Sequence, residues 1–215
     1  MDIAARVNEA KYDVFRWRYE LSIPKKFALA LGMAALTGLL AQLRIYLPGN
    51  PVPITGQTFA VLLAGVLLGR WWGGVSLAIY GGLGFAGVPW FSGWHSGVVA
   101  GGGYIIGFVL ASLFLGYFTD KYVRSRSFLS TLGLMLFANF VLIYVPGLVW
   151  RGLWLNLVAG ESTSLAALLS MSFLPYIPGD ILKAAAAATI ARGVTPKLAY
   201  NGEVDKGKWA SWRIL

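Results

Sequence analysis

The most constraining feature of this sequence is a succession of apolar segments in which charged side chains are almost absent. These segments cover residues 27–47, 57–68, 71–88, 104–118 and 128–149, and a last one extends to residue 191. A membrane-spanning helix needs about 20 mostly apolar residues, and several of the segments are near or below that length. The sequence therefore predicts an all-α, polytopic membrane protein with a compact bundle of six transmembrane helices.

The composition agrees with a membrane protein in a lipid bilayer. Of the 215 residues, 57% are hydrophobic and 13% are charged, and the mean hydropathy is +0.66. A soluble domain of this size would need more polar surface. The formal net charge of +9 would suit a nucleic-acid partner, but the placement of the basic residues favours the positive-inside bias of membrane proteins, and we expect no nucleic acid.

The distribution of Lys and Arg predicts the orientation. With the N-terminus inside, 15 of the 18 basic residues lie on the inner side, and only Arg44 and Arg151 lie in external segments. This asymmetry predicts cytoplasmic N- and C-termini in a plasma or inner membrane. Residues 1–26 are expected to form a cytoplasmic amphipathic helix, either on the membrane surface or in solvent. Residues 27–192 form the membrane domain, residues 193–215 form a cytoplasmic basic tail, and no cleavable signal peptide is expected.

One Asp and one Lys interrupt the last apolar segment. Pro178 fits the first turn of a helix that extends to about residue 192, after a separate short helix over residues 165–173. Asp180 then occupies the first turn, and Lys183 follows one turn later on the same face. Ionisable groups at membrane depth are costly and usually functional. We expect Asp180 to accept from ligand N–H groups and Lys183 to donate to a ligand carbonyl. The structural alternative is that the two only neutralise each other at a helix N-terminus.

The segment over residues 88–97 should be external, although it is apolar, aromatic and uncharged. A water-exposed loop would be more polar, so we expect it to fold back over the bundle as a lid or re-entrant wall. Packing for structure alone is the alternative. His95 is the only histidine in the sequence, and without a second His, a Cys or a neighbouring carboxylate it predicts hydrogen bonding and no metal site.

Small residues in the first apolar segment recur at four-residue spacing, at Ala30, Ala34 and Gly38. They fall on one helix face and allow another helix to approach closely. That helix could belong to a partner subunit or to the same bundle, and the spacing alone does not decide between them.

Several classes of function lack their motifs. The sequence contains no phosphate-binding loop, no nucleophile elbow and no His-Glu-x-x-His helix. The Asp–Lys pair has no nucleophile at motif spacing, which argues against an intramembrane hydrolase. A channel would need rings of charge or carbonyl groups that one such chain does not show. We therefore predict no catalytic residue and no cofactor, and a solute-binding membrane protein with its site near the outer face.

Four separated motifs resemble the BioY family, the biotin-specific S components of energy-coupling factor (ECF) transporters. They are residues 51–55 leading into 57–65, residues 87–89 with Phe91, residues 102–108, and residues 178–180 with Lys183. The resemblance implies a six-helix S-component fold that captures biotin from outside and passes it to a transmembrane T component driven by two ATPase subunits. It also implies that Ala30 and Ala34 match the family's contact motif for the T component.

The resemblance further implies which residues contact biotin. The ureido ring, with two N–H groups and one carbonyl, suits Asp180 and Lys183. The apolar rest of the ligand is predicted to contact Trp90, Phe91, Trp94 and Tyr104. The other predicted contacts are Gln57 and Thr58, at the outer start of the second span, and Ser92 in the loop. The carboxylate partner stays open, because residues 98–101 are apolar where the family often carries polar residues. Candidates are the glycine-loop N–H groups, Ser92, His95 and Arg151. An S component for a different vitamin and a small-molecule channel are the alternatives, and a homo-oligomer of the chain alone also stays open.

Overall fold

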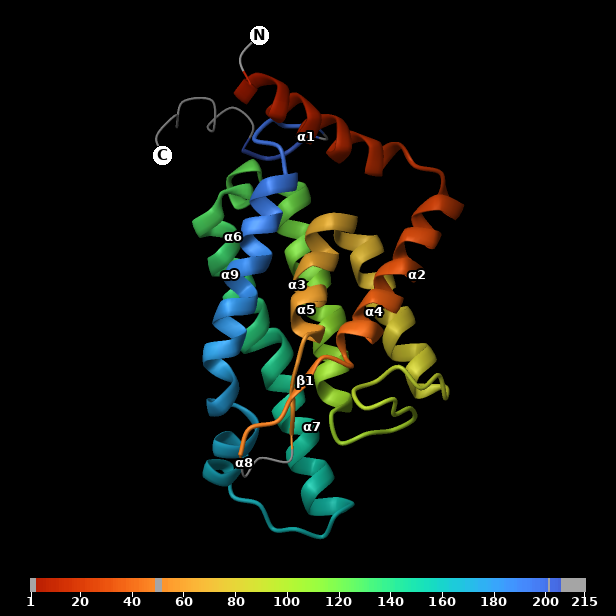
Figure 1. Cartoon of the computed structure of the whole chain (residues 1–215), viewed down its shortest axis with the longest axis vertical. Coiled ribbons are helices and arrows are strands. Elements are labelled where there is room, and N and C mark those ends of the chain that lie inside the picture. Colours follow the sequence, from red (N-terminus) through yellow and green to blue (C-terminus); the bar gives the residue numbers. More distant parts are fainter. Residues whose placement is uncertain (1–2, 49–51, 201, 206–215) are drawn as a thin grey trace.

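The computed structural model describes residues 3–48, 52–200 and 202–205. Part of the predicted external turn (residues 49–51) and the end of the basic tail (residues 206–215) lie outside the described residues. The described chain is mostly helical (Figure 1). Its elements in order are α1 (Ile3–Glu20), α2 (Ile23–Leu40), β1 (Arg44–Ile45), β2 (Ile54–Thr55), α3 (Gln57–Leu68), α4 (Arg70–Phe85), α5 (Gly102–Lys121), η1 (Val123–Arg126), α6 (Phe128–Phe137), η2 (Ala138–Ile143), α7 (Tyr144–Leu157), α8 (Leu165–Ser172), η3 (Leu174–Tyr176) and α9 (Ile177–Val194).

The longer helices extend between two ends of the molecule that differ in structure. α1 lies across one end, whereas the two short strands, α8 and the loop after α4 lie toward the other end (Figure 1). The ring centroids of Tyr12 in α1 and Tyr200 after α9 are 5.9 Å apart, so the first and last described segments share the same end. We call the two ends the α1 end and the strand end.

The centre of the bundle is formed by α3 and α5. α5 packs against α3, α4 and α7, and successive side chains around α3 are buried, including Val61, Leu62, Leu63 and Ala64. A helix that is buried on all sides is expected to be apolar all round. Among the described residues, four helical stretches are long and apolar enough to cross a membrane: Ile23–Leu40, Gly102–Lys121, Phe128–Leu157 and Leu165–Val194.

The first apolar segment ends its helix earlier than the sequence predicts. α2 stops at Leu40, whereas a span was predicted as far as residue 47. Arg44–Ile45 instead pairs with Ile54–Thr55 as a short antiparallel ladder. The backbone N–H and C=O groups of these residues therefore bond between the strands and not within a longer helix. The prediction was wrong because a short apolar run does not distinguish a helix end from a strand.

The fifth segment forms a longer helix than predicted. α6, η2 and α7 are continuous from Phe128 to Leu157, so Arg151 lies on a helix and not in an external loop. Six residues in the middle, Ala138–Ile143, are π-helical. π-helical turns are rare and occur frequently at functional sites.

The last segment is divided as the sequence predicts. α8 is a separate short helix, and α9 starts at Ile177 with Pro178 in its first turn. Because proline lacks an N–H group and has a fixed φ, this position suits it. Asp180 lies in the first turn of α9, and its side chain is buried.

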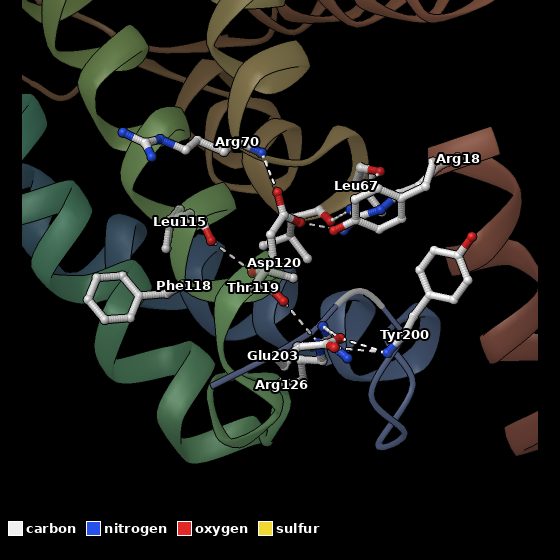
Figure 2. Close-up of polar contacts among 12 residues, drawn as sticks. Arg18, Leu67, Arg70, Leu115, Phe118, Thr119, Asp120, Arg126, Tyr200 and Glu203 are labelled. Carbon is white, nitrogen blue, oxygen red and sulfur yellow. Dashed lines mark hydrogen bonds and ion pairs between the residues drawn. The ribbon is translucent and has the colours of Figure 1, made fainter. Parts of the chain in front are cut away.

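Partly buried polar contacts hold the α1 end together (Figure 2). Arg18 donates from Nη2 to Asp120 Oδ1 at 2.6 Å and from Nη1 to the carbonyl oxygen of Val66 at 2.6 Å. Asp120 Oδ2 accepts the backbone N–H of Arg70 at 2.8 Å. Arg18 thus bonds a carbonyl group at the end of α3, and Asp120 bonds an N–H group at the start of α4, where helices leave such groups without partners.

A second ion pair, which is fully buried, attaches the C-terminal segment to the same end. Arg126 donates from Nη2 to Glu203 Oε1 at 2.6 Å, and both side chains are 0% exposed. The same guanidinium donates from Nε to the carbonyl oxygen of Thr119, and the backbone N–H of Tyr200 donates to Glu203 (Figure 2). The segment after α9 is therefore part of the folded structure.

Candidate solute-binding site

A cavity of about 570 Å³ lies toward the strand end. It is lined by residues of the segment around β2, the start of α3, the loop after α4, and the helices α5, α7 and α9. Ligand pockets in proteins typically have volumes of about 300–1,000 Å³. Of the predicted ligand contacts, those that line this cavity are Gln57, Thr58, Phe91, Ser92, Tyr104, Asp180 and Lys183.

Asp180 is buried, with 2% of its surface exposed, and its carboxylate is surrounded by donors. Lys183 Nζ lies 2.6 Å from Oδ1. Tyr144 donates its hydroxyl to Oδ2 at 2.6 Å, and Asn139 donates from Nδ2 to the same oxygen at 3.1 Å. A buried carboxylate is tolerated when it is paired and hydrogen-bonded. Their spacing of one helical turn brings the two charges into contact, so Asp180 and Lys183 pair with each other in this structure, as in the structural alternative. Their contacts with a ligand stay a prediction.

Lys183 joins α9 to the strand end as well. Its Nζ donates to the carbonyl oxygen of Thr55 at 3.0 Å. Thr55 Oγ1 in turn donates to Gln57 Oε1 at 3.0 Å, and Gln57 Nε2 donates to the hydroxyl of Tyr80 at 2.5 Å. This chain of bonds fixes Gln57 in the cavity wall and extends from α9 to α4.

The π-helical stretch explains how two polar side chains reach Asp180. Asn139 lies within η2, and Tyr144 is the first residue of α7, directly after it. They are five positions apart, and in a regular α-helix such residues would point about 140° apart at 3.6 residues per turn. The wider π turn brings them onto one side, where both donate to Asp180 Oδ2.

Close contact between α5 and α7 forms the wall beside this cluster. A Cβ atom added to Gly147 would lie 2.3 Å from the ring of Tyr104, and one added to Gly103 would lie 2.2 Å from the carbonyl oxygen of Pro146. Glycine at these two positions is what allows the helices to approach. The ring of Tyr104 consequently packs over Gly147, 5.6 Å from the ring of Tyr144 between centroids.

The loop after α4 forms another wall of the cavity, as predicted. We call residues 86–101 the lid loop. Gln42, just after α2, accepts the backbone N–H groups of Gly93 and Trp94 on Oε1 at 3.1 and 3.2 Å, and it donates from Nε2 to the carbonyl oxygen of Phe91 at 3.0 Å. Gln42 thereby holds a tight turn in which Gly93 and Trp94 have φ values of +80° and +60°.

Two predicted ligand contacts, Trp90 and Trp94, do not line the cavity. Trp90 points toward α4, where its Nε1 donates to the carbonyl oxygen of Tyr80 at 2.8 Å. Trp94 is 60% exposed, because the left-handed backbone at this position turns its side chain outward. Sequence position alone placed both residues in the loop but could not give the direction of their side chains.

The small-residue stripe in α2 packs inside the chain. Ala30 and Ala34 have no exposed surface, and a Cβ atom added to Gly38 would lie 3.1 Å from Cβ of Trp90. α2 packs against α3 and α4. In this structure the three residues therefore contact the chain's own helices and present no surface to a partner, which corresponds to the second of the two interpretations left open by their spacing.

Some buried polar atoms at the cavity have no hydrogen-bond partner among the described residues. They are Thr58 Oγ1, Arg151 Nε and Ser172 Oγ, which belong to cavity-lining residues, and Asn139 Oδ1 beside Asp180. Buried polar atoms are nearly always bonded, so each exception calls for an explanation. At the wall of a cavity, such atoms can bond a solute.

The sequence missed several residues of the site. Tyr144, Ser172, Tyr176 and Arg44 line the cavity but were not predicted. Asn139 had a signal, because it is the one strongly polar side chain in its apolar segment. Tyrosine and serine occur commonly in membrane helices and at interfaces, so no signal in the sequence indicated that Tyr144, Ser172 and Tyr176 belong to the site.

The fold and the site together define a helical membrane protein with a polar cluster inside a largely apolar, solute-sized cavity. The profile of the BioY family matches residues 11–200. The chain is 49% identical over 156 residues to the probable biotin transporter BioY of Methanothermobacter thermautotrophicus, covering 71% of this chain and 99% of that protein. It is 32% identical to the biotin transporter BioY of Rhizobium etli, covering 67% and 78%.

A solved structure has the same fold. The crystal structure of the S-component for biotin from an ECF-type ABC transporter matches with a TM-score of 0.68 and 26% identity, covering 80% of this chain and 93% of that chain. The chain belongs to the BioY family.

Proposed function

We propose that this protein is the substrate-binding S component of an ECF transporter and that it binds biotin in the cavity at the strand end. Its relatives are biotin transporters by name, and the matching solved structure is an S-component for biotin. The observation that carries the proposal is the pair of Asp180 and Lys183 in the wall of a cavity large enough for the vitamin, with Asn139 bonded to Asp180 behind them.

The cluster retains the bonding capacity that a ureido ring requires. A carboxylate offers about four acceptor sites and an ammonium group three donors. Asp180 uses three of its sites within the chain, and Lys183 uses two of its donors. The remaining acceptor site on Asp180 can take a ureido N–H group, while the third N–H of Lys183 donates to the carbonyl. An ion pair within the chain therefore does not prevent these residues from binding the ring.

The apolar part of biotin would lie against the remaining walls. Phe91, Tyr104, Ile105 and Phe108 line the cavity and supply apolar and aromatic surface. Burying apolar surface contributes roughly 25 cal/mol per Å². The lid loop, held by Gln42, would then cover the ligand from the strand end.

The transport role extends the proposal to the membrane and to partner subunits. α2, α3, α4, α5, the continuous α6–η2–α7 helix and α9 would supply six crossings, with both termini and the α1 end in the cytoplasm and the strand end outside. The excess of Lys and Arg in the terminal segments supports this orientation. A transmembrane T component and two ATPase subunits would complete the transporter, because the chain itself has no phosphate-binding loop.

Equilibrium binding of radiolabelled biotin to the purified protein tests the proposal. Asp180→Asn and Lys183→Met should each weaken binding by about 100-fold or more, because each removes a charged partner of the ureido ring and leaves its neighbour's charge unpaired. Asp13→Asn and Lys25→Met, which change the same residue types at exposed positions, should bind like the unmodified protein. Size-exclusion profiles show whether each variant is folded. Unchanged affinity in folded Asp180→Asn, or tighter binding of riboflavin or thiamine than of biotin, would contradict the proposal.

A further inference from the structure

The cavity has a second polar position, distant from the Asp180 cluster, on the same face of α7. Tyr144, Gly147 and Arg151 are separated by three and four positions, so they share one side of the helix. Tyr144 bonds Asp180, and Gly147 faces the ring of Tyr104. Arg151 also lines the cavity. Seven residues of helix place it about 10 Å along the axis from Tyr144.

Arg151 is a cation without a counter-charge in this cavity. Its Nε is buried and has no hydrogen-bond partner among the described residues, and none of the ion pairs in the described chain includes it. Among the described residues that line the cavity, Asp180 is the only acidic one, and it is already paired with Lys183. The positive charge of Arg151 is therefore available to an anionic group of the solute. Guanidinium groups bind carboxylates through two parallel bonds.

The other basic groups around the cavity are less suited to this role. Arg44 is exposed and donates to the hydroxyl of Tyr46 at 3.2 Å. His95 is also exposed. Water and salt screen exposed charges, so these groups contribute less to a specific contact than a guanidinium with a buried Nε. Ser172 Oγ, buried and unpartnered in the same cavity, offers a neutral donor in addition.

We propose that Arg151 binds the carboxylate of the ligand and makes this site selective for a solute with an amide-like head group at one end and an anion at the other. This inference rests on the proposed function, since it takes biotin as the ligand. In biotin, a short aliphatic chain separates the ureido ring from the carboxylate. The ring lies at Asp180, the chain passes Tyr104 above Gly147, and the carboxylate reaches Arg151.

The experiment compares biotin with biotinamide, which has the same rings and chain but a neutral end. The unmodified protein should prefer biotin by about 10- to 100-fold, the range expected for hydrogen bonds to a charged group. Arg151→Gln should lose this preference: biotin affinity falls by about 10- to 100-fold, and biotinamide affinity changes by less than about 3-fold. Arg151→Lys, which keeps the charge, should restore part of the preference. Arg124→Gln, at an exposed position outside the cavity, is the matched control and should keep the preference.

Other outcomes have distinct meanings. If Arg151→Gln lowers the affinity for biotin and for biotinamide equally, Arg151 has a structural role and the inference is wrong. If Arg44→Gln abolishes the preference instead, the anion binds elsewhere. Asp180→Asn should lower the affinity for both ligands alike, because they share the ureido ring. This result would uphold the proposed function even if the proposed role of Arg151 is wrong. Absence of biotin binding in the unmodified protein would overturn both the proposed function and the proposed role of Arg151.

Discussion

At the residue scale, the central question is how a carboxylate is accommodated at 2% exposure in an apolar bundle. Removing a charge from water is costly unless donors replace the lost hydration. Asp180 receives an ammonium group, a phenol hydroxyl and an amide N–H from three different side chains. Only the first of these is local in sequence, so the stability of the charged group depends on the placement of Asn139 and Tyr144 beside α9.

The phenol hydroxyl can be removed with little change of shape. Tyr144→Phe should weaken biotin binding by about 10-fold, because Asp180 loses one of its three donors and is less firmly held for the ligand. Isothermal titration calorimetry or radioligand binding measures the change. Tyr117→Phe, a matched change on α5 outside the cavity, should leave the affinity unchanged. Equal effects of the two variants would mean that Tyr144 does not act through the carboxylate.

The sequence predicted part of this cluster for a physical reason. Two charges inside an apolar segment stand out by their cost, so Asp180 and Lys183 could be found without a structure. Their direct contact was not predicted, since helical spacing gives proximity but not side-chain conformation. Tyr144 could not be predicted because the direction of its side chain depends on the π-helical stretch before it. No residue type in the sequence indicates where an α-helix changes to π-helical geometry.

At the element scale, the wall of the cavity depends on how closely α5 and α7 approach. The ring of Tyr104 occupies the space over Gly147, so a methyl group there must push the helices apart. Gly147→Ala should destabilise the protein by about 1–3 kcal/mol, the usual cost of overpacking, and should also weaken biotin binding. The thermal unfolding midpoint in detergent measures the first effect.

Gly133 in α6 offers the control for that substitution. A Cβ atom at this helical position would have no neighbour within 4 Å. Gly133→Ala should therefore be neutral or stabilising, by up to about 1 kcal/mol, because alanine is the better helix former. If both variants changed stability alike, helix propensity and not packing would account for the effect of Gly147→Ala.

Helix existence was easier to predict than helix ends. Long apolar runs identified the helices, and prolines identified the division between α8 and α9. The continuation of α7 through Arg151 was missed because a basic residue flanked by tryptophans is typical of a membrane interface. In the folded chain the same residue faces a cavity, where polar groups are tolerated inside a membrane helix.

At the scale of the whole molecule, the two ends have separate chemistry. The strand end contains the cavity. At the α1 end, helix α1 is docked through Phe15, which is 3% exposed. The guanidinium carbons of Arg18 and Arg126 lie 3.9 and 4.3 Å from the centroid of its ring. The sequence predicted the helix but left open whether it lies on the membrane surface or in solvent. Its docking depends on partners more than 50 positions away, such as Asp120, which no local pattern reveals.

The ion pair between Arg126 and Glu203 makes the C-terminal attachment sensitive to pH. Burial alone would raise the pKa of Glu203, but the backbone N–H of Tyr200 and the guanidinium of Arg126 outweigh it and lower the pKa below the usual range. Because the folded state favours the carboxylate, this stabilisation is complete above the ordinary pKa of a glutamate and is lost as the pH falls through the lowered value. Amide hydrogen exchange from Thr195 to Tyr200 should therefore be slow at pH 7 and should accelerate only under acidic conditions.

Glu203→Gln separates this ion pair from other effects of acid. The variant should exchange faster at pH 7, with a loss of local stability of about 3 kcal/mol, since Arg126 is left as a buried charge without its partner. It should also lose most of the pH dependence in this segment. Glu9→Gln, at an exposed position in α1, should behave like the unmodified protein. Biotin affinity at pH 7 should stay the same in both variants, because the cavity lies at the opposite end of the bundle. A fall in affinity in Glu203→Gln would instead show that the two ends are energetically coupled.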